Sequence, residues 1–227
     1  MFKKAIEILY DQDLLPVNRD NAANYITLVG VWMSRFSLYV FFGALAWFLY
    51  AGEVSQWARG VAIALTSFAA VMDGIDGYVA RKFKCVSDFG KIFDPHHDKI
   101  QYQCKTLGLI TDSFFALLAT GNYWFLLFAI PVKYFTGERD ETVGFHRTWA
   151  ATVSDQIQVS ARQSGKWRTR VCFTALPILH LVIYPFAHVP SFIVLALLCI
   201  AVTNWSLHDY VTGYRDAIRS AKKASVN

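Results

Sequence analysis

Residues 71–99 read VMDGIDGYVARKFKCVSDFGKIFDPHHDK and set four aspartates between two long apolar segments. Asp73 and Asp76 are three positions apart, so a helix would carry both carboxylates on one face. Asp94 and Asp98 are four positions apart and would share a face of the following helix. Ionisable residues are rare inside membranes and mark functional sites there. If the two helices pack side by side, the four carboxylates converge.

The composition of the whole chain is that of a membrane protein. Hydrophobic residues make up 55% of the 227 residues and aromatic residues 16%, whereas only 17% are charged. A chain of this length cannot bury so much apolar surface in a single core, so lipid must cover the rest. Few glycines and prolines, and apolar blocks without heptads, exclude collagen-like, disordered and coiled-coil classes. The 4 cysteines form no CxxC pair and are expected to be free thiols.

Six apolar segments predict the membrane topology, since a helix needs about 20 residues to cross a bilayer. The predicted fold is therefore an all-α integral membrane protein with six transmembrane helices. The fourth segment is short, and its helix can continue through 137–149 beyond the membrane surface. The segments are 25–50, 57–80, 90–119, 122–136, 167–187 and 189–213.

The two ends of the chain differ from the apolar domain between them. Residues 1–20 predict an N-terminal amphipathic helix lying in the membrane interface, with an ordinary amphipathic surface helix as the alternative. A cleavable signal peptide is not expected, because this region has no unbroken apolar stretch. Residues 21–213 are expected to form one membrane domain, and residues 214–227 a basic cytoplasmic tail that binds anionic headgroups.

Lysine and arginine gather on one side of the predicted spans. The termini and the connections near 81–90 and 137–166 hold nearly all of the flanking basic residues, whereas the turns at 120–122 and 187–190 have none. The positive-inside rule then places both termini and the acidic residues on the cytoplasmic side. The expected location is a cell (inner) membrane, crossed several times.

Gathered carboxylates have a chemical requirement of their own. In a medium of low dielectric constant they repel one another unless a proton or a cation neutralises them. Oxygen ligands alone favour a hard metal, so we expect Mg2+ or Mn2+, as a pair of ions. Such ions can bridge phosphate oxygens and orient an oxygen nucleophile. For any single aspartate, a helix cap or a loop charge is the alternative.

The same stretch resembles the signature of the CDP-alcohol phosphatidyltransferases, which is DxxDGxxAR, eight residues, then GxxxDxxxD. The resemblance extends over about residues 20–213 and implies a six-helix fold with its site on the cytoplasmic side. It also implies a reaction in which an alcohol hydroxyl attacks the β-phosphorus of a CDP-linked lipid and expels CMP. The matching residues are Asp73, Asp76, Gly77, Ala80, Arg81, Gly90, Asp94 and Asp98.

The resemblance further implies roles for individual residues. The first three aspartates would bind metal, and Asp98 would both bind metal and accept the hydroxyl proton, which a carboxylate can do. The stretch NYITLVG at 24–30 resembles the family's NxxT motif, although Asn24 could equally cap its helix. The residues that match contacts to the CDP-lipid are Asn24, Thr27, Gly77, Arg81, Ser87 and Gly90.

A basic loop over residues 137–170 is expected to bind the acceptor. Its excess of arginine and lysine suits an anion. The RD pair at 139–140, GKWRT at 165–169 and DPHHDK at 94–99 resemble the phosphatidylglycerophosphate synthase branch, which implies sn-glycerol 3-phosphate as the acceptor. Each basic residue could instead serve membrane topology alone. The candidates for binding the acceptor phosphate are Arg139, Arg147, Lys166 and Arg168.

The chain departs from that branch at several positions. His96 and His97 replace small or apolar residues, and Gly30 stands where many members carry arginine. The nearest rival hypothesis is the same chemistry with inositol phosphate, or with phosphatidylglycerol as in cardiolipin synthases. An ion or proton carrier is more remote, because the acids cluster toward one leaflet. Expected partners are CDP-diacylglycerol, glycerol 3-phosphate, membrane lipids and a second copy in a homodimer, with no nucleic acid.

Overall fold

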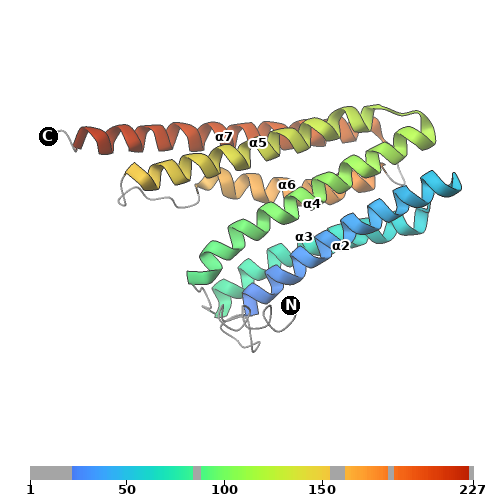
Figure 1. The fold of residues 1–227 in the computed structure, drawn as a ribbon, viewed down its shortest axis with the longest axis horizontal. Coiled ribbons are helices and arrows are strands. Elements are labelled where there is room, and N and C mark those ends of the chain that lie inside the picture. Colours follow the sequence, from blue (N-terminus) through green and yellow to red (C-terminus); the bar gives the residue numbers. More distant parts are fainter. Residues whose placement is uncertain (1–21, 84–87, 154–161, 184–186, 225–227) are drawn as a thin grey trace. The chain divides into compact units, whose positions relative to one another are not determined.

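The regular secondary structure of the described chain is entirely helical (Figure 1). The computed structural model describes residues 22–83, 88–153, 162–183 and 187–224. The all-α prediction is confirmed for the described residues, and each of the six predicted segments overlaps one helix. The helices are α2 (Ala22–Ala51), α3 (Gln56–Phe83), α4 (Asp88–Thr120), α5 (Trp124–Val153), α6 (Gln163–Ile183) and α7 (Val189–Ala224).

The chain divides into two compact units, Met1–Phe115 and Ala116–Asn227. In the first unit α2 packs along α3, and the part of α4 up to Phe115 contributes buried side chains to both. In the second unit α7 packs against both α5 and α6. Each unit therefore brings residues from three helices together.

Local signals in the sequence set the two short turns that follow α2 and α4. Gly52 follows α2 with φ of 74°, and Gly121 follows α4 with φ of 69°. Each donates its N–H to the carbonyl four residues earlier at 2.8 Å, a common helix ending that glycine adopts without strain. Ser55 and Asn122 then cap α3 and α5, because their side-chain oxygens accept backbone N–H groups at 3.3 and 3.1 Å.

Three described helices are long and apolar enough to cross a membrane: Ala23–Ala51, Gln56–Val79 and Val189–Ala221. They correspond to the first, second and sixth predicted spans. The other three predicted spans stay predictions. The predicted interfacial helix at 1–20 lies outside the described residues.

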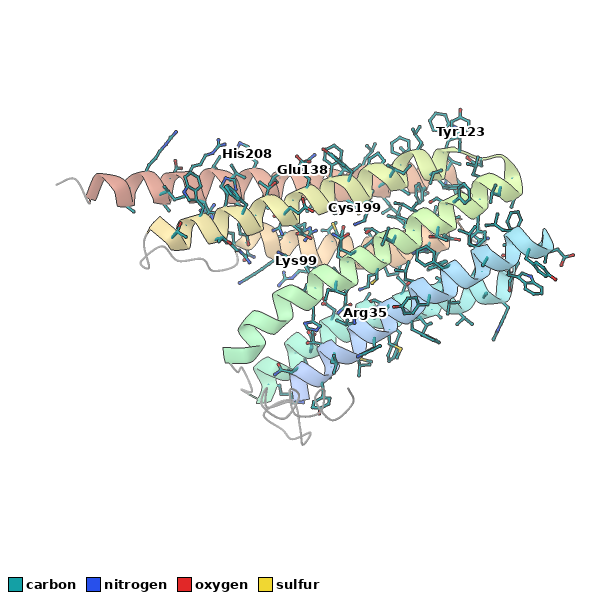
Figure 2. All side chains as sticks on the ribbon, in the orientation of Figure 1. Arg35, Lys99, Tyr123, Glu138, Cys199 and His208 are labelled. Atoms are coloured by element: carbon teal, nitrogen blue, oxygen red, sulfur yellow. The ribbon has the colours of Figure 1, made fainter. Side chains whose placement is uncertain are left out.

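Exposed aromatic side chains also fit a lipid environment. Trp32 and Phe36 on α2 are more than half exposed, at 55% and 56%. Stacked or tilted aromatic pairs lie at the turns, Trp47 with Tyr50 and Tyr123 with Trp124. Figure 2 labels Tyr123 at the turn between α4 and α5. Tryptophan and tyrosine concentrate where a membrane meets water, so these pairs mark the ends of the apolar helices.

A buried ion pair joins α3 to α4 within the first unit. The Arg59 Nε atom lies 2.7 Å from Asp112 Oδ1, and the two side chains are 6% and 0% exposed. The guanidinium also lies 5.7 Å from the centre of the Phe115 ring. Both charges have left water, so each depends on the other for its stability.

We expect the Asp112→Asn variant to be less stable than the wild type by about 3 kcal/mol, because the Arg59 charge would stay buried without its anion. The measurement is the thermal unfolding midpoint of the purified protein in detergent. Asp216→Asn on the exposed side of α7 is the matched control. The double variant Arg59→Met, Asp112→Leu should recover part of the loss, and an unchanged midpoint for Asp112→Asn would contradict the prediction.

Candidate active site

Acidic side chains of the signature meet in the first unit, on α3 and α4. The Asp73 carboxyl group lies within hydrogen-bonding distance of Asp98. Asp76 accepts a hydrogen bond from Thr27 on α2, with 2.7 Å between Oγ1 and Oδ2. The contacts Asp73–Asp98 and Thr27–Asp76 therefore lie close together, because Asp73 and Asp76 are about one helical turn apart on α3. Residues of α2, α3 and α4 take part in them.

The start of α2 is arranged around this contact. Asn24 and Thr27 are both buried, at 4% and 1% exposure, and share a face of the helix because they are three residues apart. The chain is already helical at Ala22. The capping alternative for Asn24 is therefore wrong, because a capping residue precedes its helix.

The donor chemistry of the site fits a hard divalent cation. Two carboxylates in hydrogen-bonding contact need a shared proton or a cation between them, and their oxygens are the ligands that Mg2+ and Mn2+ prefer. Among the side chains that the structure describes, no three acidic, histidine or cysteine groups gather closely enough to form a complete metal site. Four predicted site residues lie outside these described side chains: Arg81, Ser87, Gly90 and Asp94.

A buried lysine beside the acids was missed by the sequence reasoning. Asp98, Gln101 and Lys105 recur at intervals of three and four on α4, so they share a face. The Lys105 ammonium donates to Gln101 Oε1 at 3.1 Å and attracts the charges of both Asp73 and Asp98. The spacing of Asp98, Gln101 and Lys105 in the sequence is the signal that could have revealed this face.

Gly30 gives Gln101 its room against α2. A Cβ atom at Gly30 would lie 3.1 Å from Gln101 Nε2, closer than such contacts normally are. Ser34 on the same helix lies 3.5 Å from Gln101 Oε1. Gly30 stands where many members of the branch carry arginine. In this chain the side chain of Gln101 from α4 occupies the space beside it.

A second polar cluster lies in the second unit and is cationic. Arg139 on α5 and Arg168 on α6 both contact Asp140, with Nη1–Oδ1 distances of 2.8 and 3.2 Å. Arg139 Nη2 also donates to Ser206 on α7 at 3.1 Å. Two guanidiniums against one carboxylate leave one net positive charge in a buried place. Burial lowers the pKa of Arg139, the neighbouring charge of Arg168 lowers it further, and Asp140 opposes both effects.

Tyr210 on α7 supports this cluster. Its ring lies under Arg139 and Arg147, with guanidinium-to-centroid distances of 5.0 and 5.6 Å. The Nε atoms of these two arginines are buried and have no hydrogen-bond partner among the described residues. Tyr210 Oη accepts the backbone N–H of Arg162 at 2.8 Å. A Cβ at Gly165 would lie 2.6 Å from that oxygen, which explains the glycine of GKWRT.

Asp209 ties the start of α6 to α7 beside Tyr210. It pairs with Arg162 at 2.7 Å and accepts a short hydrogen bond from Ser164. The Arg162 guanidinium packs directly against Gly213, in space that a Cβ atom there would occupy. These contacts hold the helix that carries Arg168.

A family model described as CDP-alcohol phosphatidyltransferase matches residues 20–207. The chain belongs to this family. The matched region includes the acidic residues of the first unit and the arginine cluster of the second. It ends before Tyr210, the residue on which that cluster is built.

Relatives of this chain include phosphatidyltransferases named for glycerol 3-phosphate and a cardiolipin synthase. The chain is 32% identical to CDP-diacylglycerol–glycerol-3-phosphate 3-phosphatidyltransferase 2 of Arabidopsis thaliana over 125 residues. These residues make up 54% of this chain and 52% of that protein. It is 26% identical over 143 residues to the similarly named protein of Haemophilus influenzae, covering 63% and 71%. It is 33% identical over 125 residues to a cardiolipin synthase (CMP-forming) of Oryza sativa subsp. japonica, covering 54% and 37%. The chain thus spans about half the length of the Arabidopsis relative.

The described parts of the basic region that lie within 137–153 and 163–170 are helical, which corrects the prediction of a loop there. Arg139 and Arg147 lie on α5, which continues to Val153, and Lys166 and Arg168 lie on α6. Helical continuation through 137–149 is confirmed. The structure places Arg168 in the buried cluster but leaves Lys166 exposed, because residues two apart point about 200° away from each other on a helix.

Proposed function

We propose that this protein is a metal-dependent transferase of phospholipid biosynthesis. It would move the phosphatidyl group from CDP-diacylglycerol to sn-glycerol 3-phosphate, giving phosphatidylglycerophosphate and CMP. The observation that carries the proposal is the contact of Asp73 with Asp98, because it joins the two halves of the family signature.

The donor would be bound by the first unit. Thr27 positions Asp76 through its hydroxyl, and the buried Asn24 adds a polar group on the same face of α2. Gly77, Arg81, Ser87 and Gly90 are the further candidates for contacts to the CDP-lipid. Mg2+ or Mn2+, held by Asp73, Asp76, Asp94 and Asp98 as two ions, would supply charge stabilisation for the pyrophosphate oxygens.

The chemistry assigned to Asp98 is proton acceptance. The acceptor hydroxyl oxygen forms a bond to the β-phosphorus of the CDP-lipid, and its proton passes to the carboxylate. The bond from that phosphorus to the bridging oxygen breaks, and CMP leaves with the oxygen. The contact between Asp98 and Asp73 orients the carboxylate that takes the proton.

The acceptor phosphate would be bound by the second unit. Arg139, Arg147 and Arg168 provide the cations. The buried Nε atoms of Arg139 and Arg147 have no hydrogen-bond partner among the described residues and can donate to an anion. A phosphate monoester carries up to two negative charges, which suits the net positive cluster better than the single charge of a phosphodiester. Lys166 stays a candidate from the sequence, but its exposure makes it the weakest of the four.

Phosphatidylglycerol is the second candidate acceptor, because a relative of comparable identity is named a cardiolipin synthase. The donor and the proton transfer would be the same. We further propose that the protein crosses the membrane six times, places both termini and the site on the cytoplasmic side, and forms a homodimer.

The test is release of CMP from CDP-diacylglycerol by the purified protein in detergent, with each acceptor added separately. Glycerol 3-phosphate is expected to stimulate release most, whereas stimulation by phosphatidylglycerol or inositol phosphate alone would replace the proposed acceptor. EDTA should stop release, and added Mg2+ or Mn2+ should restore it. Full activity after metal removal would contradict the role given to the aspartates.

A further inference from the structure

A buried ammonium group lies on the face of α4 that also carries Asp98 and Gln101. Lys105 is 1% exposed, and its charge acts on the carboxylates of Asp73 and Asp98. A lysine at this depth costs several kcal/mol unless anions and hydrogen-bond acceptors surround it. Asp73 and Asp98 are the two carboxylates that attract the Lys105 charge.

The surroundings of Lys105 fix its position. Its Nζ atom donates to Gln101 Oε1 at 3.1 Å, and Gln101 is itself fully buried against Gly30 on α2. A Cβ atom at Gly30 would press against the Gln101 amide, whose oxygen is the acceptor for the ammonium. Burial and the hydrogen bond to Gln101 therefore hold the Lys105 side chain in one place.

We propose that Lys105 is a resident counter-ion of the acidic site, which stabilises the paired carboxylates in the absence of metal and weakens their affinity for a divalent cation. The proposal rests on the metal site of the proposed function. Its physical basis is charge competition: a fixed positive charge beside two ligands repels an arriving cation that needs the same oxygens. The site would therefore be loaded only at a higher metal concentration than carboxylates alone would require.

The test is a titration of the metal-free protein in detergent with MgCl2, followed by the thermal unfolding midpoint, without any lipid substrate. Lys105→Met removes the charge and keeps the length of the side chain. Its metal-free midpoint should fall by about 5 °C or more, because the carboxylates lose their cation. Its half-saturating Mg2+ concentration should fall about tenfold.

Two further variants separate charge from packing. Lys105→Arg keeps the charge and should stay close to the wild type in Mg2+ affinity. Arg35→Met removes a charge from the same unit, on α2 (Arg35 is labelled in Figure 2). Its guanidinium lies 5.7 Å from the centre of the Trp32 ring, and the variant should leave the Mg2+ affinity unchanged.

The outcomes distinguish this inference from the proposed function. If Mg2+ stabilises the wild type and Lys105→Met binds it no more tightly, the counter-ion role is wrong while the metal site stands. If Mg2+ and Mn2+ both fail to stabilise the wild type, the metal dependence in the proposed function is wrong, and the counter-ion role is overturned with it.

Discussion

Asp98→Asn should release CMP at least about 100-fold more slowly than the wild type, because an amide cannot accept the proton of the attacking hydroxyl. Binding of CDP-diacylglycerol should persist in part, since Asp76 and its partner Thr27 are unchanged. The measurements are single-turnover release of CMP and equilibrium binding of labelled CDP-diacylglycerol.

The control for this prediction is Glu53→Gln, which removes an exposed carboxylate at the turn after α2. It should leave turnover unchanged. Near-normal turnover in Asp98→Asn would remove the proton-acceptor role from Asp98. Loss of donor binding together with turnover would instead show that Asp98 mainly holds the donor site together.

Arg139→Gln should raise the KM for glycerol 3-phosphate about 100-fold, because it removes one of the guanidiniums that share Asp140 and lie over Tyr210. The KM for CDP-diacylglycerol should change little, since its proposed contacts lie in the other unit. Initial rates measured over a range of both substrates give the two constants separately.

Arg215→Gln on the exposed surface of α7 is the matched control and should behave as the wild type. An equal rise in both KM values for Arg139→Gln would indicate a general loss of structure. An unchanged KM for glycerol 3-phosphate would exclude the cluster as the acceptor site, whatever the identity of the acceptor.

The helices were predictable because their signals are local. Apolar runs located the six helices of the described residues. Two turns are marked by the backbone and capping preferences of Gly52, Ser55, Gly121 and Asn122. The signature acids were predictable for a similar reason, since their spacing is that of a helix face. Nothing in these patterns depends on which helices become neighbours.

The rest of the site depends on contacts between helices far apart in the sequence. Tyr210 is central to the arginine cluster only because α7 packs against both α5 and α6. Lys105 matters only because α4 places it beside Asp73 of α3. The many charges within 137–170 predicted a loop, whereas residues 137–153 and 163–170 lie on α5 and α6.

The unbroken course of α7 has a practical consequence. Its 36 residues extend about 54 Å, well beyond the roughly 30 Å of hydrocarbon that a bilayer offers. Tyr214 and Ile218 still pack into the core shared with α5 near its end. A rigid helical fusion joined in register after Ala224 would therefore turn with the second unit, giving a protein of 25.7 kDa the added mass that electron-microscopic image alignment needs.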